Sequence, residues 1–208
     1  MIITKQKDIN KIKESLSNSK KIFLFGCGEC STTCKTGGED EIKAAIESFK
    51  IDGKVVLGYD IPKAPCVASQ TKLSIAKNRQ KIEEVDAVVV FACGLGTQTI
   101  KENLRLQKNV CDTLFMGATD SKGNFKEMCS ACGECVLELT GTICPVTLCS
   151  KGLLNGPCGG MRKGKCEVDK ERDCAWVLIY ENLKKEGKLE LLKNIQKPKD
   201  RSKENRPR

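Results

Sequence analysis

Cysteine is the residue type that most constrains how this chain folds. The 208 residues include fourteen cysteines and no histidine, and three cysteines stand at intervals of three in the segment CSACGECVLELTGTICP, residues 129–145. No apolar run at the N-terminus is long enough for a secretion signal, and no later segment resembles a membrane span. We therefore expect a reducing, cytoplasmic location, where disulfides are rare and dense cysteines usually bind metal.

The net charge of the chain is formally +9 when every thiol is counted as neutral. Four thiolates around a [4Fe-4S]2+ core or a Zn2+ ion leave a charge of −2, so three such sites would reduce the total to about +3. Part of the remainder lies in residues 197–208, KPKDRSKENRPR, which we expect to form a solvated, disordered basic tail. No basic patch is interleaved with aromatic residues, so nucleic-acid binding is not expected.

The first part of the sequence alternates short apolar runs with amphipathic segments. This alternation predicts an α/β fold with a doubly wound parallel sheet of the flavodoxin or Rossmann type over residues 1–122. The predicted strands are 21–26, 54–60, 86–92 and 112–118, and the predicted helices are 7–17, 39–50, 69–85 and 97–105, the last capped by Thr97.

The composition of the sequence changes after residue 122. Residues 126–175 contain eight cysteines and many glycines but no long periodic segment, so they cannot bury a large apolar core. We expect residues 123–196 to form a small module organised by metal, with a helix or helix pair over 174–195.

Five cysteines of the first domain each follow a predicted strand. The carboxyl edge of an open parallel sheet is where such folds bind ligands, and four thiolates suit a [4Fe-4S] cluster. The predicted ligands are Cys27, Cys30 and Cys93, with Cys34 and Cys66 as alternatives for the fourth place.

Two other interpretations apply to this domain. The segment GCGECS is one residue away from GxGxxG and is followed by Asp60 at the end of the second strand, which is compatible with a dinucleotide, and the thiols could also be structural. Cys111, at the start of the predicted fourth strand and hence at the opposite sheet edge, is expected to be a small buried apolar residue.

The eight cysteines of the module divide into two sets of four. CxxCxxC is typical of a ferredoxin-type cluster, whereas zinc usually takes two CxxC knuckles, of which only one tract occurs here. We predict one cluster on Cys129, Cys132, Cys135 and Cys174, and a second site, for iron–sulfur or Zn2+, on Cys144, Cys149, Cys158 and Cys166.

The run from 129 to 183 resembles the methylenetetrahydrofolate reductase C-terminal domain family, in its segments LLNGPCGG, GKCE and CAW. The segment FLFGCGECSTTCKTGGE also fits the MetV subunits of two-subunit reductases from acetogenic and related anaerobic bacteria. The resemblance implies a MetF-type flavoprotein partner, which reduces methylenetetrahydrofolate on the methyl branch of the Wood–Ljungdahl pathway. It also implies that this subunit supplies electrons to the partner's flavin.

The sequence itself favours electron transfer over catalysis, because it offers thiols but no histidine and no apparent acid–base pair. We expect two or three [4Fe-4S] clusters, with Zn2+ as an option in one site, and an upstream donor such as ferredoxin or an NADH-oxidising subunit. The alternatives are a non-redox scaffold stapled by metal, and another redox protein that shares the cysteine module, such as a methyltransferase activator.

Overall fold

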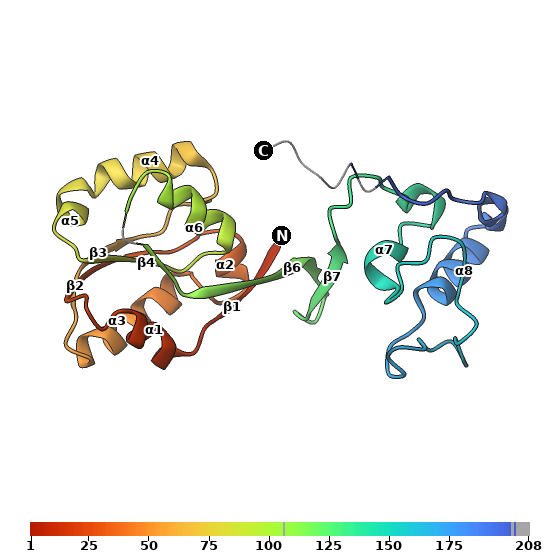
Figure 1. Ribbon diagram of the computed structural model, residues 1–208, viewed down its shortest axis with the longest axis horizontal. Helices are drawn as coiled ribbons and strands as arrows, with labels where there is room; N and C mark the ends of the chain where they lie inside the picture. The colour runs from red at the N-terminus through yellow and green to blue at the C-terminus, as the bar shows by residue number, and fades with distance from the viewer. Residues whose placement is uncertain (106, 201, 203–208) are drawn as a thin grey trace. The chain divides into compact units, whose positions relative to one another are not determined.

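A computed structural model describes residues 1–105, 107–200 and 202 (Figure 1). The chain divides into two units, Met1–Phe115 and Met116–Arg208. This boundary lies a few residues before residue 122, inside strand β6 (Cys111–Thr119). Over the described residues, none of the helices has the length and apolar character needed to cross a lipid bilayer.

A four-stranded parallel sheet forms the centre of the first unit. Its strands lie in the order β3-β2-β4-β5, which is the order of the first four strands of flavodoxin-type folds and confirms the predicted α/β class. Phe25 at the end of β2 pairs with Asp60 of β3 and Val90 of β4, so three strands end at one level. The strands are β2 (Lys21–Phe25), β3 (Val55–Asp60), β4 (Ala87–Val90) and β5 (Gln107–Asn109).

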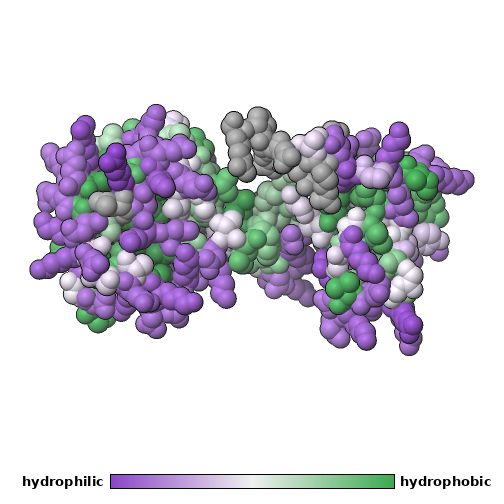
Figure 2. Space-filling view, viewed as in Figure 1, coloured by the Kyte–Doolittle hydropathy of each residue, from purple (hydrophilic) through white to green (hydrophobic). Residues whose placement is uncertain are grey.

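Helices cover both faces of this sheet (Figure 1). Because side chains alternate along a strand, Ile22 and Leu24 of β2 pack with Phe49 on one face, and Phe23 and Phe25 pack on the other. The first face is covered by α1 (Ile9–Ser15) and α3 (Glu39–Ile51), and the second by α4 (Ala68–Lys77), α5 (Arg79–Glu83) and α6 (Gly94–Lys101). Hydrophilic residues cover most of the face of this unit seen in Figure 2.

Two predicted helices differ from the observed ones. The helix expected over 69–85 is interrupted at Asn78, whose side chain donates to Asp60 Oδ2 at 3.2 Å and to the Ser74 carbonyl at 2.9 Å. The prediction that Thr97 caps the next helix was wrong, because α6 begins at Gly94 with Cys93 as its N-cap. The Thr97 hydroxyl instead donates to the Cys93 carbonyl within the helix.

The fourth strand of the parallel sheet was also predicted wrongly. The segment 112–118 does form a strand, β6, but it lies in a separate sheet of order β1-β6-β7, where it is antiparallel to β7 (Phe125–Cys129). The fourth parallel strand is β5, whose sequence QKN gives no apolar signal. Strand β1 (Ile2–Gln6) and the short helix α2 (Cys30–Thr33) were not predicted.

Cys111 is fully buried, as expected, but its predicted position at the opposite edge was wrong. It follows β5 rather than starting the fourth parallel strand, and its thiol contacts the Thr36 carbonyl at 3.5 Å. Thr36 lies on the chain segment that follows the carboxyl end of β2, so Cys111 packs against that segment.

The second unit has a small core built on α8 (Ala175–Lys185). Trp176, Ile179 and Leu183 of this helix are buried together with Cys174, and the Trp176 indole donates to the Leu153 carbonyl at 2.9 Å. The remaining elements are η1 (Leu137–Leu139), α7 (Pro145–Leu148) and η2 (Leu189–Lys193), so the predicted 174–195 helix pair is one helix and a 3-10 turn.

The expected basic tail begins at residue 197. Residues 197–200 are described. The Asp200 amide donates to Glu134 Oε2 at 3.1 Å, so the start of the tail contacts the CxxCxxC segment within the second unit. Residues 201 and 203–208 lie outside the described residues.

Helix α3 offers a matched pair of substitutions that test the core of the first unit. Phe49→Ala should destabilise the protein by about 3–5 kcal/mol, because it removes a fully buried aromatic ring and leaves a cavity. Ile51→Ala, on the same helix but 87% exposed, should change stability by less than about 0.5 kcal/mol. Urea unfolding followed by circular dichroism measures both, and similar losses would contradict this packing.

Candidate metal centres

The loops that follow β2, β3 and β4 pack closely at the carboxyl edge of the sheet. A Cβ on Gly37 would lie 1.9 Å from the Phe91 carbonyl oxygen, and one on Gly26 would lie 2.6 Å from the Gly37 oxygen. The Gly28 amide donates to the Pro62 carbonyl at 3.0 Å, which ties the first loop to the second. Glycine is therefore required where these backbones meet, and the thiols on the three loops share one edge.

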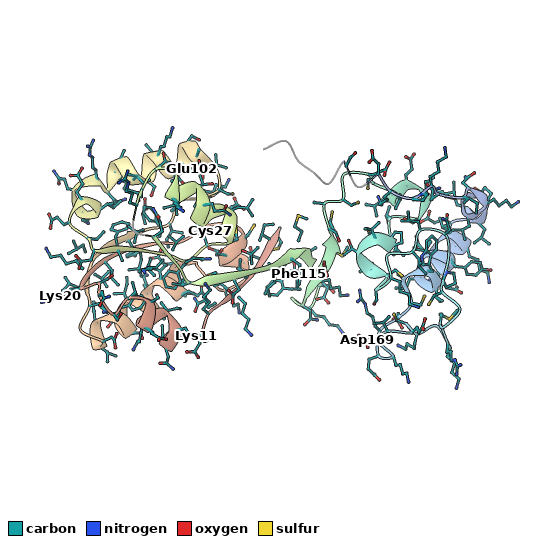
Figure 3. The ribbon with its side chains drawn as sticks, in the orientation of Figure 1. Lys11, Lys20, Cys27, Glu102, Phe115 and Asp169 are labelled. Carbon is teal, nitrogen blue, oxygen red and sulfur yellow. The ribbon has the colours of Figure 1, made fainter. Side chains whose placement is uncertain are left out.

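Burial and neighbouring thiols affect the pKa of Cys66. Burial of the Cys66 thiol raises its pKa, and so do the neighbouring thiols of Cys93, Cys27 and Cys30, although residue 66 as a whole is exposed. Cys27 (labelled in Figure 3) and Cys93 are buried. The loops after β2, β3 and β4 thus carry Cys27, Cys30, Cys66 and Cys93 at the same edge of the sheet.

Cys34 is held by a different element, the N-terminal strand β1. Its thiol donates to the Ile2 carbonyl at 3.7 Å, while the Ile2 amide donates to the Cys30 sulfur at 3.4 Å. The strand is fixed to this loop by the buried hydroxyl pair of Thr4 and Thr36, 2.6 Å apart. Cys30 and Cys34 therefore both contact the backbone of Ile2, and the choice between Cys34 and Cys66 for the fourth place stays a prediction.

The dinucleotide interpretation of the same loop loses its support. Asp60 Oδ2 accepts from Ser74 at 2.5 Å and from Asn78 at 3.2 Å, so its carboxylate is engaged within the fold. The glycine loop leads into α2, a helix of four residues, rather than a long helix whose N-terminus could receive a pyrophosphate.

The CxxCxxC segment forms a loop with two residues in left-handed conformation, Ala131 (φ 52°) and Gly133 (φ 75°). The Ala131 amide turns back to the Cys129 sulfur at 3.3 Å. Burial would raise the pKa of Cys132, but hydrogen bonds from the backbone at Glu134 and from the Lys199 ammonium, 3.2 Å from the sulfur, outweigh it and lower that pKa. The loop thus favours a thiolate at Cys132. Cys135 follows on the same loop and is exposed.

Cys144 is connected to this loop through hydroxyl groups. Its thiol donates to the Thr147 hydroxyl at 3.6 Å, and Thr147 is in turn 2.8 Å from the Ser130 hydroxyl. Helix α7, which Cys144 precedes as N-cap, packs against β7. The sequence grouped Cys144 with Cys149, Cys158 and Cys166, and that grouping stays a prediction; the contacts through Thr147 offer the CxxCxxC loop as an alternative.

Cys149, Cys158, Cys166 and Cys174 line a single small cavity of about 20 Å³. Cys174 is the N-cap of α8 and is buried next to Trp176, which together with Pro157 also lines the cavity. Cys174 therefore accompanies this set, whereas the sequence assigned it to the CxxCxxC loop.

Two charged side chains also line this cavity. Lys151 and Glu167 form an ion pair at 2.5 Å, and the Cys158 thiol lies 3.2 Å from the same carboxylate. The hydroxyl of Ser150, followed by backbone amides, lowers the pKa of Cys166. A lysine at this point can offset the charge of thiolates, and none of these polar neighbours was identified from the sequence. The sequence signal for Ser150, Lys151 and Glu167 is that they stand directly after cysteines, in the segments CSK and CE.

Within the described ranges, no three cysteine or carboxylate side chains are already arranged around a common metal position. The fit to a metal is therefore one of donor chemistry and neighbourhood. Thiolate-only sets are the ligands that Zn2+ and iron–sulfur clusters prefer. The loops at the sheet edge, the CxxCxxC loop, and the cavity lined by Cys149, Cys158, Cys166 and Cys174 offer such donors.

Cys111 provides a test of the burial of thiols around the first site. Burial raises its pKa to about 12, so at pH 8 almost none of it is thiolate. In metal-free native protein, Cys111 should resist iodoacetamide while exposed Cys129 is alkylated, and both should react after unfolding. Peptide mass spectrometry measures the labelling, and equal native rates at the two positions would contradict the packing described.

Comparison with known proteins gives one match. Residues 108–202 match the family described as methylene-tetrahydrofolate reductase C terminal. No curated protein and no solved structure matches the chain. The matched region includes all eight cysteines of the two thiol sets in the second unit. Residues 108–202 of this chain are thus similar to the methylene-tetrahydrofolate reductase C-terminal family.

Proposed function

We propose that this chain is the iron–sulfur electron-transfer subunit of a methylenetetrahydrofolate reductase and passes electrons to the flavin of a MetF-type partner. The observation that carries the proposal is that Cys149, Cys158, Cys166 and Cys174 line one cavity inside the region that matches the reductase family, and that the same region contains the CxxCxxC loop. Tetrathiolate sets are what [4Fe-4S] clusters require. A bound cluster supplies a one-electron carrier, which links a single-electron donor to a two-electron flavin.

The proposed ligand sets exchange Cys144 and Cys174 relative to the grouping expected from the sequence. The first is Cys27, Cys30, Cys66 and Cys93; the second is Cys129, Cys132, Cys135 and Cys144; the third is Cys149, Cys158, Cys166 and Cys174. The first two contain CxxC-type tracts and suit [4Fe-4S] clusters. The third surrounds a cavity of ion size within the core of its unit, which suits a closed structural Zn2+ site.

The surrounding residues perform the supporting tasks that such centres need. Burial of Cys27 and Cys93 keeps water from the first set. The amide of Ile2 donates to the Cys30 sulfur, and Lys199 places positive charge beside the second set, whereas Lys151 beside the third set is paired with Glu167. Amide donors and nearby charges stabilise thiolate ligands and tune reduction potentials.

A non-redox scaffold is the second candidate, and the position of Cys174 is the observation that favours it. Cys174 belongs to the small core of the second unit, where a metal would replace missing apolar contacts. This role suits the third set, while the first two sets remain available for electron transfer. The two functions therefore divide between sites of the same chain.

We further propose that the protein works in the cytoplasm, with ferredoxin or an NADH-oxidising subunit as the donor. The thiol-rich composition needs a reducing compartment, and no helix in the described part of the chain crosses a bilayer. The pathway assigned to it is the methyl branch of the Wood–Ljungdahl pathway, through the family of residues 108–202.

The two alternative groupings of the C-terminal cysteines make opposite predictions for a pair of variants. Cys144→Ser should lower the iron content by one cluster and leave zinc unchanged, whereas Cys174→Ser should remove zinc and leave iron unchanged. Anaerobic purification with iron, sulfide and zinc analysis measures both variants. Cys34→Ala serves as the control, because its thiol bonds to Ile2 and should not contribute to either count. Iron loss in Cys174→Ser with normal iron in Cys144→Ser would restore the sequence-based grouping.

The relay itself predicts a dependence of the partner on this subunit. With a reduced viologen or the physiological donor, a MetF-type flavoprotein should be reduced faster with this chain than without it. Cys30→Ser should abolish the gain, because it removes a ligand of the first set. Stopped-flow bleaching of the flavin is the measurement. An equal rate with and without the chain, in a complex that still forms, would support the scaffold in place of the relay.

A further inference from the structure

The second unit contains a second cavity, of about 220 Å³, next to the one lined by thiols. Its walls are mainly apolar and aromatic. They come from three parts of the chain, namely η1, the glycine-rich segment 152–160, and α8 with η2. The lining includes Leu139, Leu154, Pro157, Trp176, Tyr180 and Leu192.

Trp176 forms a common wall between the two cavities. Trp176 and Pro157 line both the outer cavity and the cavity of the third thiol set. The indole is 5% exposed, and its hydrogen bond to the Leu153 carbonyl fixes its plane. Because one side chain bounds both spaces, a molecule in the outer cavity lies one indole away from the third set.

The outer cavity also offers polar groups for a ligand. Tyr180, which is 44% exposed, and Asn194 both line it, and among the described residues neither side chain makes a hydrogen bond. By contrast, Asn155 is fully engaged, since it donates to the Gln196 carbonyl at 2.9 Å and accepts from the Gln196 amide at 2.7 Å. These two hydrogen bonds fix Asn155 in the cavity wall. The Tyr180 hydroxyl and the Asn194 side-chain amide are therefore the groups available to bind a ligand.

We propose that the outer cavity binds a planar nitrogen heterocycle that carries an amide-like edge. Aromatic walls favour a flat ring that stacks or meets them edge to face, and a free carboxamide pairs with adjacent N–H and C=O groups on one edge. Flavin, pterin and nicotinamide rings share this chemistry. The site would place a redox-active ring beside the metal-bearing core, so its biological use rests on the proposed function, but the binding itself does not.

The experiment uses the full-length, metal-replete protein and three probes, riboflavin, folic acid and nicotinamide mononucleotide. Isothermal titration calorimetry gives the affinity of each, and the comparison identifies which ring is preferred. Trp176 is the only tryptophan of the chain, so quenching of its fluorescence reports contact at this wall. We expect at least one probe to bind with one-to-one stoichiometry and to quench Trp176.

Substitutions of residues in the cavity wall distinguish specific binding from nonspecific hydrophobic binding. Tyr180→Ala should weaken binding roughly tenfold through loss of a ring contact, and Asn194→Ala should weaken it several-fold through loss of a hydrogen bond. Leu178→Ala, on the same helix but outside the lining, should leave affinity unchanged. Tyr180→Phe, which keeps the ring and removes only the hydroxyl, should retain most of the affinity, and an unchanged unfolding transition of Tyr180→Ala shows that its loss of binding is not a folding defect.

Three outcomes would overturn the proposal. They are no binding of any probe, unchanged affinity in both Tyr180→Ala and Asn194→Ala, or equally tight binding of naphthalene, which lacks an amide edge. If the wall variants weaken probe binding as expected but the protein does not accelerate flavin reduction, this inference stands and the relay fails. The reverse result would remove the ligand site and keep the relay.

Discussion

The pairing of β2 with both β3 and β4 is the interaction on which the first unit depends. Since Phe25 pairs with Asp60 on one side and Val90 on the other, the three strands stop together and release their loops at one edge. The loops then pack so closely that glycine is needed at residues 26 and 37. The approach of the Gly37 backbone to Phe91 ties the loop of Cys27 and Cys30 to the strand that leads to Cys93. The shared edge of these thiol-bearing loops is thus a consequence of strand register. It also includes the point where the strand order reverses, with β3 on one side of β2 and β4 on the other, which is where such sheets bind ligands.

The second unit depends on a different constraint, the scarcity of apolar residues. Its core consists of one face of α8 with a few partly buried neighbours, which is little for a unit of this length. Cys174 enters this core directly before Trp176, and three further thiols from distant loops meet it at the same cavity. A metal at that point would connect the segments around residues 149, 158 and 166 to α8. Folding and metal binding are then expected to be coupled in this unit more than in the first.

The sequence predicted what depends on local periodicity and failed where distant segments decide. The apolar runs of β2 and β4 and the amphipathic pattern of α3 are local, and each formed as predicted. Strand β5 consists of polar residues and exists because the edge of β4 is available to it, so no periodicity could reveal it. The same limit applies to the thiols. Cysteine spacing identified the CxxCxxC loop, but the neighbours of Cys144 and Cys174 are set by how α7 packs on β7 and how α8 enters the core. Spacing along the chain contains neither fact.

The net positive charge of the chain can be related to the positions of its cysteines. A count that gives +9 treats every thiol as neutral, yet metal binding requires thiolates, and each tetrathiolate centre keeps a residual negative charge. Lysines stand where that charge would be. Lys199 donates to the Cys132 sulfur, and Lys151 pairs with Glu167 on the wall of the third cavity. Thus part of the positive excess is a local counter-charge to the thiols, rather than a surface for polyanions. Lys199 comes from the first residues of the basic tail, so this tail contributes to the electrostatics of the CxxCxxC loop. Since nearby positive charge favours the more reduced, more negative state of a cluster, a lysine in this position raises the reduction potential of any cluster held there.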